Sequence, residues 1–128
     1  MAFTRILTAL AEGSPFELFG DGSASRGFTY VGDAVAATTA AMERGPGGAT
    51  YNVGGGAEAT MREAIAICER VSGGTLDLRL RPGAKGDVAR TAADTTRIRT
   101  DLGWSAAVGL EEGLRAQWAW VSAKVPAR

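Results

Sequence analysis

The chain has 128 residues, of which 14 are basic, 14 are acidic and none is histidine, so its formal net charge is zero. This length suits one domain or part of one, and an apolar content of 45% is enough to build a hydrophobic core. The charge balance argues against a broad electrostatic surface for nucleic acid or anionic membrane, and the lack of histidine excludes Ser-His or Cys-His nucleophiles and His-based metal sites.

Hydrophobic periodicity and turn residues divide the chain into short helices and strands. In chain order, we predict a helix over residues 2–12, strands over 16–19 and 28–31, a helix over 33–44, a strand over 49–53, a helix from a cap at 60 to about 71, a strand over 76–80, a short helix over 97–102 and a final helix over 110–121. These elements predict an α+β (mixed α/β) fold, in which a small sheet of short strands packs with about five helices.

Local signals mark several ends and turns. Thr60 is a good N-cap and Glu63 completes a capping box, while Asp33 can cap the Ala-rich helix that follows it. Gly103 can end the short helix before it. Residues 20–23 (Gly-Asp-Gly-Ser) predict a turn, because glycine tolerates positive φ and the Asp or Ser side chain can bond back to the backbone.

A single cysteine, Cys68, rules out an intrachain disulfide and fits a reducing, cytoplasmic location. Cys68 shares the apolar face of a predicted helix, so we interpret it as a small core side chain. No apolar stretch approaches the roughly 20 residues of a membrane span. Trp104, Trp118 and Trp120 are interpreted as packing or interface residues.

Two sets of basic residues are candidates for anion binding. Arg26 lies between the glycine turn and a predicted strand, and its planar guanidinium suits phosphate, although a surface arginine is the alternative. Further along, a local positive charge is predicted, with a solvated charged loop as the alternative. It consists of Arg79, Arg81, Lys85 and Arg90.

The glycine-rich segment over residues 53–59 follows a predicted strand and precedes a predicted helix. Its spacing is not G-x-G-x-x-G, no acidic residue about 20 positions on ends a second strand, and no Lys-Ser/Thr follows the glycines. We therefore interpret it as a tight strand-to-helix turn, with the lining of a substrate cleft as the alternative.

Four motifs in order carry a resemblance to a known family. They are LFGDGSASRGFTYVGDAV over residues 18–35, YNVGGG over 51–56, GDV at 86–88 leading through Thr91 to Ala93-Asp94, and LGW at 102–104. Together they resemble the C-terminal part of nucleotide-sugar epimerases and dehydratases, the extended short-chain dehydrogenase/reductases.

The resemblance implies that residues 1–128 form the nucleotide-sugar-binding lobe of such an enzyme, with no dinucleotide-binding domain in this chain. It implies a UDP- or dTDP-linked sugar as ligand, and NAD as the cofactor of the parent family but of no site in this chain. FTYV and GDV…T.AD resemble the epimerase branch that acts on UDP-glucose or UDP-glucuronate. A dehydratase or decarboxylase fragment and a non-catalytic binding or interaction module are the alternatives.

By the same resemblance, Arg26 contacts the diphosphate of the nucleotide sugar. Two positions depart from the family pattern around it. Gly27 stands where the family usually has Asp, and Gly32 replaces the first acid of the usual Asp-Asp pair, while Asp33 is kept.

Asp87 is implied to contact ribose, together with a basic residue that contacts phosphate. The family often has an arginine two residues before Gly-Asp, where this chain has Ala84. Arg81 or Lys85 could supply the charge at that place, without the same bidentate geometry.

The resemblance also implies that the strand with Phe16 and Leu18 passes the nucleobase, whose edge its backbone would read. A plain core strand is the alternative for that stretch. Asn52 is implied to organise the glycine loop beneath the bound nucleotide.

The chemistry of the family depends on a Tyr-x-x-x-Lys pair, whose tyrosine takes a proton from the sugar hydroxyl while NAD takes the hydride. Here Tyr30 is followed four places on by Ala34, and Tyr51 by Gly55. We therefore assign no catalytic, cofactor-binding or metal residue, leave enzymatic activity open and expect no turnover by the 128 residues alone.

Three interpretations remain: a truncated product that works only beside the rest of an NAD-dependent enzyme, a stand-alone nucleotide-sugar-binding module, and a folded remnant or interaction domain. The first two predict binding of a nucleotide sugar. An apolar surface is also expected where the lobe would meet a Rossmann-domain partner, or where a homodimer would cover it.

Overall fold

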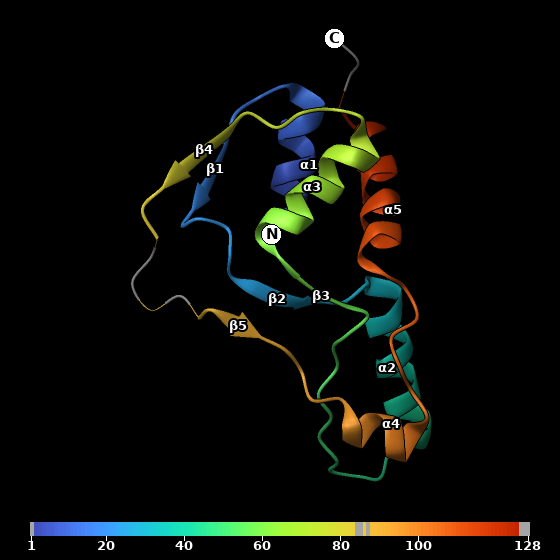
Figure 1. The fold of residues 1–128 in the computed structure, drawn as a ribbon. Helices are drawn as coiled ribbons and strands as arrows, with labels where there is room; N and C mark the ends of the chain where they lie inside the picture. Colours follow the sequence, from blue (N-terminus) through green and yellow to red (C-terminus); the bar gives the residue numbers. More distant parts are fainter. Residues whose placement is uncertain (1, 84–85, 87, 126–128) are drawn as a thin grey trace. The chain divides into compact units, whose positions relative to one another are not determined.

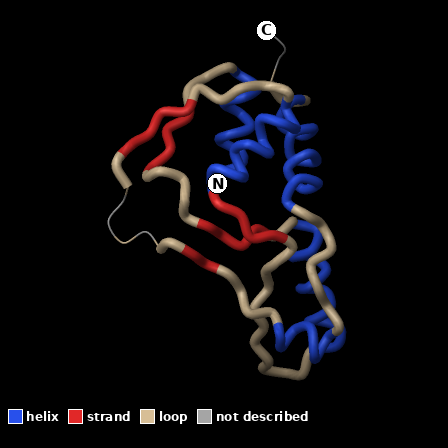
Figure 2. The backbone as a smooth tube through the Cα atoms, in the orientation of Figure 1, coloured by secondary structure: helices blue, strands red, loops and turns tan. Residues whose placement is uncertain are grey.

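The computed structural model describes residues 2–83, 86 and 88–125, and these form two compact units. The first unit comprises Met1–Ala24, Thr60–Ala89 and Glu111–Arg128, and the second comprises Ser25–Ala59 and Arg90–Leu110. Each unit is therefore assembled from segments that are distant in sequence. Both units mix helices with short strands (Figure 2), which confirms the predicted α+β class.

The first unit holds three helices and a two-stranded parallel sheet (Figure 1). Its elements are α1 (Ala2–Glu12), β1 (Phe16–Phe19), α3 (Met61–Ser72), β4 (Leu78–Arg81) and α5 (Leu110–Ser122), whose first residue belongs to the second unit. Helix α1 contacts α3, and the Gln117 amide of α5 donates a hydrogen bond to Thr4 Oγ1 of α1 at 3.0 Å. The three helices are therefore tied together by α1.

The predicted apolar helix faces form the core of this unit. Its most deeply buried side chains, each at most 2% exposed, are Ile6, Leu7, Ala64, Cys68, Leu114 and Val121. Burial raises the pKa of the Cys68 thiol to about 12, so this cysteine is the inert core side chain that we predicted.

Helix α3 begins at the predicted capping box. Thr60 Oγ1 accepts a hydrogen bond from the Glu63 N–H at 3.2 Å, and the Glu63 carboxylate accepts one from the Thr60 N–H at 2.7 Å. Two N–H groups that the helix itself cannot satisfy are thus bonded. At the other end, Gly73 takes a left-handed conformation with φ of 71° and stops the helix.

The second unit holds a three-stranded sheet in the order β3-β2-β5 and two helices that contact each other. Its elements are β2 (Ser25–Phe28), α2 (Val31–Arg44), β3 (Ala57–Thr60, whose last residue belongs to the first unit), β5 (Arg90–Thr91) and α4 (Thr96–Leu102). Its core is a buried cluster of Ala37, Ala40, Ile98, Leu102 and Trp104.

The start of α2 differs from the prediction. The strand before it ends at Phe28 and the helix begins at Val31, so the predicted strand over 28–31 and the predicted cap at Asp33 are both wrong. Asp33 is instead a buried residue of the first turn. Its Oδ2 accepts a hydrogen bond from the Val108 N–H at 3.0 Å, and its carbonyl oxygen accepts one from Trp104 Nε1–H at 3.1 Å. The aspartate therefore fastens the segment after α4 to α2.

Residues 49–53 do not form the predicted strand. A strand needs a hydrogen-bonded neighbour, which periodicity alone does not reveal. Here the stretch is held by side chains: Arg97 Nη1 donates to the Thr50 carbonyl at 3.2 Å, and Asn52 Nδ2 donates to the Asp94 carbonyl at 3.3 Å. The strand of this region is β3, inside the predicted loop, and β5 is a further strand that the pattern did not predict.

Helix α2 carries an exposed apolar stripe. Val31 is 68% exposed, Val35 60% and Met42 81%, and their spacing places them on one side of the helix. Within the described ranges of the chain, no helix has both the length and the apolar character needed to cross a bilayer.

We predict that Asp33→Ala lowers the free energy of unfolding by about 1–3 kcal/mol, because it leaves the Val108 N–H without its acceptor. Asp33→Asn keeps an oxygen acceptor and should cost clearly less. Glu43→Ala, which removes an exposed carboxylate from the same helix, is the matched control. Urea titration measures all three, and equal losses for the Ala and Asn variants at position 33 would contradict the role given to this hydrogen bond.

Candidate functional site

The predicted base-binding strand is β1, which lies in the first unit. Phe16 and Leu18 are each only 7% exposed, and their register partners on β4 are Leu78 and Leu80. Their side chains fill the core, so a ligand could reach this strand only through its backbone. The core-strand interpretation accounts for both side chains, and a base contact stays a prediction.

Arg81 lies on β4 of the same sheet, on the face opposite Phe16 and Leu18. It lies opposite Phe19 in the register, and its Nε and Nη2 both donate to Glu17 Oε1, the former at 3.0 Å. This arginine lowers the pKa of Glu17 through the hydrogen bond and the ion pair. The charge of Arg81 is therefore matched by a carboxylate of the neighbouring strand.

The glycine turn between β1 and β2 forms as predicted, with Asp21 and Ser23 closing it. The Asp21 carboxylate accepts hydrogen bonds from the Ser23 hydroxyl at 2.6 Å and the Ser23 N–H at 2.9 Å, and these bonds lower its pKa. Gly22 has φ of 77°, and a Cβ there would lie 2.9 Å from the Arg62 side chain. The Arg62 N–H also donates to the Gly22 carbonyl at 3.1 Å. Only glycine combines this backbone angle with this close approach.

Arg26 lies on β2, the central strand of the second unit's sheet. Its register partner on β5 is Thr91, and its Nη1 donates to the carbonyl oxygen of Ser25 at 2.8 Å. The residue is half-buried. At Gly27, where the family pattern usually has Asp, a Cβ would make ordinary van der Waals contact with the Thr91 carbonyl oxygen at 3.7 Å.

The sequence did not predict that the Glu58 carboxylate joins Ser25 and Arg90 in this sheet. Glu58 of β3 accepts a hydrogen bond from the Ser25 hydroxyl at 2.9 Å and a bidentate pair from Arg90 at 2.6 and 2.8 Å. The Arg90 hydrogen bond, followed by that of Ser25, lowers the pKa of Glu58 to about 2. The alternation Ala-Glu-Ala-Thr over residues 57–60 was the available signal for this strand.

The predicted local positive site is largely neutralised. Arg79 pairs with Asp77 at 3.1 Å, Arg81 with Glu17, and Arg90 with Glu58. Three of the four predicted basic residues therefore have a carboxylate partner that the sequence analysis did not consider. Lys85, the fourth, lies outside the described residues, as do Ala84 and Asp87.

The Asn52 amide donates a hydrogen bond to the Asp94 carbonyl, while its implied role in the loop beneath a nucleotide stays a prediction. The Asp94 carboxylate in turn accepts the Thr96 N–H at 2.9 Å, which supports the start of α4. Hydrogen bonding from the Thr96 side chain, followed by that from its backbone, lowers the pKa of Asp94. In the neighbouring glycine loop, a Cβ on Gly56 would lie 2.8 Å from the Val108 carbonyl. The loop leads into strand β3 and not directly into a helix, so the predicted strand-to-helix turn is corrected to a connection into β3.

The structure thus brings together two groups of predicted site residues. Phe16, Leu18 and Arg81 share the small sheet of the first unit. Arg26 and Asn52 belong to the second unit, each with a partner in that unit.

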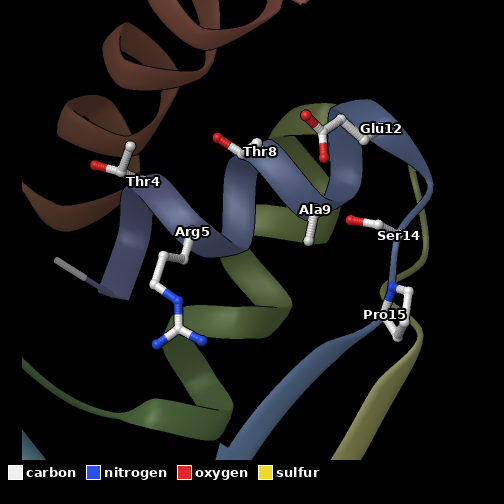
Figure 3. Close-up of a pocket in the computed structure, with 7 residues that line it drawn as sticks. All are labelled: Thr4, Arg5, Thr8, Ala9, Glu12, Ser14 and Pro15. Carbon is white, nitrogen blue, oxygen red and sulfur yellow. The ribbon is translucent and has the colours of Figure 1, made fainter.

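A surface pocket of about 250 Å³ lies along α1 and the loop that follows it (Figure 3). Its lining includes Arg5, Glu12 and Ser14, and none of the predicted site residues. Among the residues that the structure describes, no cluster of His, Cys, Asp and Glu side chains could hold a metal ion. We therefore retain the predicted residues, and not this pocket, as the candidate site.

Known proteins are similar to this chain over segments of both units. The family model of GDP-mannose 4,6 dehydratase matches residues 1–117. The chain is 36% identical over 117 residues to a dTDP-glucose 4,6-dehydratase of Streptomyces griseus, covering 91% of this chain and 36% of that protein.

Solved structures are similar as well. The UDP-glucuronic acid 4-epimerase of Bacillus cereus, in complex with UDP-glucuronic acid and NAD, matches with a TM-score of 0.91 and 32% identity over 97% of this chain and 40% of its own. The UDP-glucose 4-epimerase of Thermotoga maritima, with UDP-glucose, matches with a TM-score of 0.91 and 28% identity over 98% of this chain and 40% of its own. The chain thus spans about two fifths of the length of the proteins it matches.

The lowered pKa of Glu58 predicts a specific loss of stability in acid. Because the folded-state value of about 2 lies below the ordinary 4.5, the Arg90 and Ser25 contacts stabilise the fold above about pH 4.5 and are lost as the pH falls toward 2. We expect the free energy of unfolding to fall less steeply over this range in Glu58→Gln than in the unchanged chain. Urea titrations at several pH values measure both slopes, and identical slopes would contradict the assignment.

Proposed function

Since the chain belongs to the family of NAD-dependent nucleotide-sugar epimerases and dehydratases, the extended short-chain dehydrogenase/reductases, we propose that it supplies the nucleotide-sugar-binding part of such an enzyme. We further propose a UDP-linked sugar as the ligand and 4-epimerisation as the reaction of the whole enzyme. Two of the similar solved structures, one with UDP-glucuronic acid and one with UDP-glucose, are 4-epimerases, which supports this choice.

The observation that carries the proposal is the glycine turn followed by Arg26. The turn is closed by Asp21 and Ser23, and its backbone angle at position 22 requires glycine. Arg26 then stands on the central strand of a sheet, half-buried, with its guanidinium bonded to the backbone. A planar guanidinium with several donors suits the two phosphates of a nucleoside diphosphate sugar.

The other predicted residues complete the proposal. We assign the nucleobase to the backbone of β1, because the side chains of Phe16 and Leu18 are buried. Asp87 remains the proposed ribose partner, and Arg81 a phosphate partner that would have to be shared with Glu17. Asn52 shapes the loop beneath the ligand through Asp94.

We assign no NAD contact to the chain's own residues, because its glycine loop over 54–56 lacks the G-x-G-x-x-G spacing. NAD would supply hydride transfer in the whole enzyme. What these residues contribute is therefore binding and orientation of the sugar nucleotide.

A dehydratase is the second candidate. The S. griseus dTDP-glucose 4,6-dehydratase is 36% identical, above the identities of the two epimerase structures. A dTDP-linked sugar would then take the place of the UDP-linked one at the same residues.

We also propose that the apolar stripe of α2 meets a protein partner, a Rossmann domain rather than a second copy of this chain. Val31, Val35 and Met42 expose the apolar surface that such a contact would bury. Light scattering of the pure chain should give the mass of a monomer. A stable dimer that dissociates in Val35→Lys would instead assign the stripe to a second copy.

We predict that the chain binds UDP-glucuronate, UDP-glucose or dTDP-glucose, and that Arg26→Ala weakens this binding at least tenfold, the equivalent of about 1.4 kcal/mol. Arg115→Ala, which removes an exposed arginine of α5, is the control and should bind as the unchanged chain does. Isothermal titration calorimetry measures each affinity, and the preference among the three ligands separates the epimerase from the dehydratase assignment.

The same protein, mixed with NAD and each sugar nucleotide, should give no epimerised or dehydrated product, because no Tyr-x-x-x-Lys pair occurs in its 128 residues. Turnover by the pure chain would contradict the proposal of a binding part. Failure to bind any of the three ligands would contradict the proposed function as a whole.

A further inference from the structure

The strand that carries Arg26 is held by an unusually short neighbour. Strand β5 has only two residues, and its pairing with β2 consists of Ser25 opposite Arg90 and Arg26 opposite Thr91. A two-residue ladder contributes few backbone hydrogen bonds, so side chains must hold β5 against β2.

One carboxylate joins all three strands of this sheet. Glu58 lies on β3, at one edge, and accepts two hydrogen bonds from Arg90 on β5, at the other edge, at 2.6 and 2.8 Å. Between them, the Ser25 hydroxyl of β2 donates to the same carboxylate at 2.9 Å. We call these three residues the strand clamp. Its planar, bidentate ion pair restrains the distance between the two edge strands.

The strand clamp is linked to Arg26 by the backbone. Successive side chains of a strand point to opposite faces, so Arg26 projects from the face opposite Ser25. The Arg26 guanidinium also donates to the carbonyl oxygen of Ser25 at 2.8 Å. Any displacement of Ser25 therefore moves both the base of the Arg26 side chain and one acceptor of its guanidinium.

We propose that Glu58 and Arg90 are positioning residues for nucleotide-sugar binding, which act by holding Ser25 and thereby setting the guanidinium of Arg26 before the ligand arrives. The inference rests on the proposed function, because it assigns a role toward the same ligand. A long side chain that is ordered in advance loses less conformational entropy on binding, so the clamp raises affinity without touching the ligand.

The chain offers a matched control for an ion pair that has no such link. Arg70 and Glu111 are 2.6 Å apart, the same distance as Arg90 and Glu58, and their side chains are comparably exposed. They join α3 to α5 within the first unit, whereas Arg26 belongs to the second. If the loss of an exposed ion pair were by itself enough to weaken nucleotide-sugar binding, breaking either pair should lower the affinity equally.

The test measures affinity for UDP-glucose and UDP-glucuronate by calorimetry, well below the unfolding temperature of every variant. We expect Glu58→Gln and Arg90→Ala to bind about tenfold more weakly, while Arg70→Ala binds as the unchanged chain does. The charge-swapped double variant Glu58→Arg/Arg90→Glu should recover most of the affinity. Hydrogen exchange at the amides of residues 25–28 should be faster in both single variants and restored in the swap.

A second pair of variants separates positioning from a general loss of structure. In an Arg26→Lys background the planar guanidinium is gone, so Arg90→Ala should weaken binding by about twofold at most. An equal loss in both backgrounds, or unchanged affinity in Arg90→Ala and Glu58→Gln, would overturn the inference while leaving the proposed function intact. If the unchanged chain binds neither ligand, the proposed function fails and this inference fails with it.

Discussion

Hydrogen bonding to the Glu58 carboxylate is the constraint on which the small sheet of the second unit depends. Three short strands, one of only two residues, meet at this side chain through the Ser25 hydroxyl and the Arg90 guanidinium. Exposed ion pairs generally contribute little to stability, but bidentate geometry and a shared third donor make this one specific. Because Arg26 is the next residue on the central strand, the same contacts determine where the candidate ligand-binding arginine stands.

Charge pairing also changes how the basic residues of the chain should be understood. Arg79, Arg81 and Arg90 each form an ion pair with a carboxylate, so these charges contribute to the structure in and beside the two sheets. This agrees with a chain whose formal net charge is zero. Recognition of a sugar nucleotide by such a chain would depend on the placement of single side chains and backbone groups more than on net charge.

The family of the chain and the share of its relatives' length that it spans are the basis of the proposed function. The chain shares sequence with a dehydratase and fold with epimerases over nearly its whole length, yet it spans about two fifths of those proteins. Val31, Val35 and Met42 of α2 expose apolar surface, and we propose that a protein partner covers it.

The sequence by itself determined the helices, because their signals are local. In α3, for example, Thr60 and Glu63 of the capping box are three residues apart, and Gly73 directly follows the helix. The apolar face with Cys68 follows from the spacing of residues within the same helix. The ordered motifs likewise identified the family before any fold was known. The glycine turn was also predictable, since its hydrogen bonds join neighbouring residues.

Strand β1 coincides with the predicted strand over 16–19, but only the tertiary structure decided the second unit's strands and the ion pairs, because both depend on partners far away in the chain. Residues 49–53 have the composition of a strand but no ladder, whereas Arg90 and Thr91 form one only because β2 lies beside them. The residue type of Asp33 suits a helix cap. In the structure its carboxylate instead accepts a hydrogen bond from the Val108 N–H, and its carbonyl oxygen accepts one from the Trp104 side chain. Glu58 meets Arg90 across 32 positions and Arg81 meets Glu17 across 64, separations at which composition and periodicity carry no information.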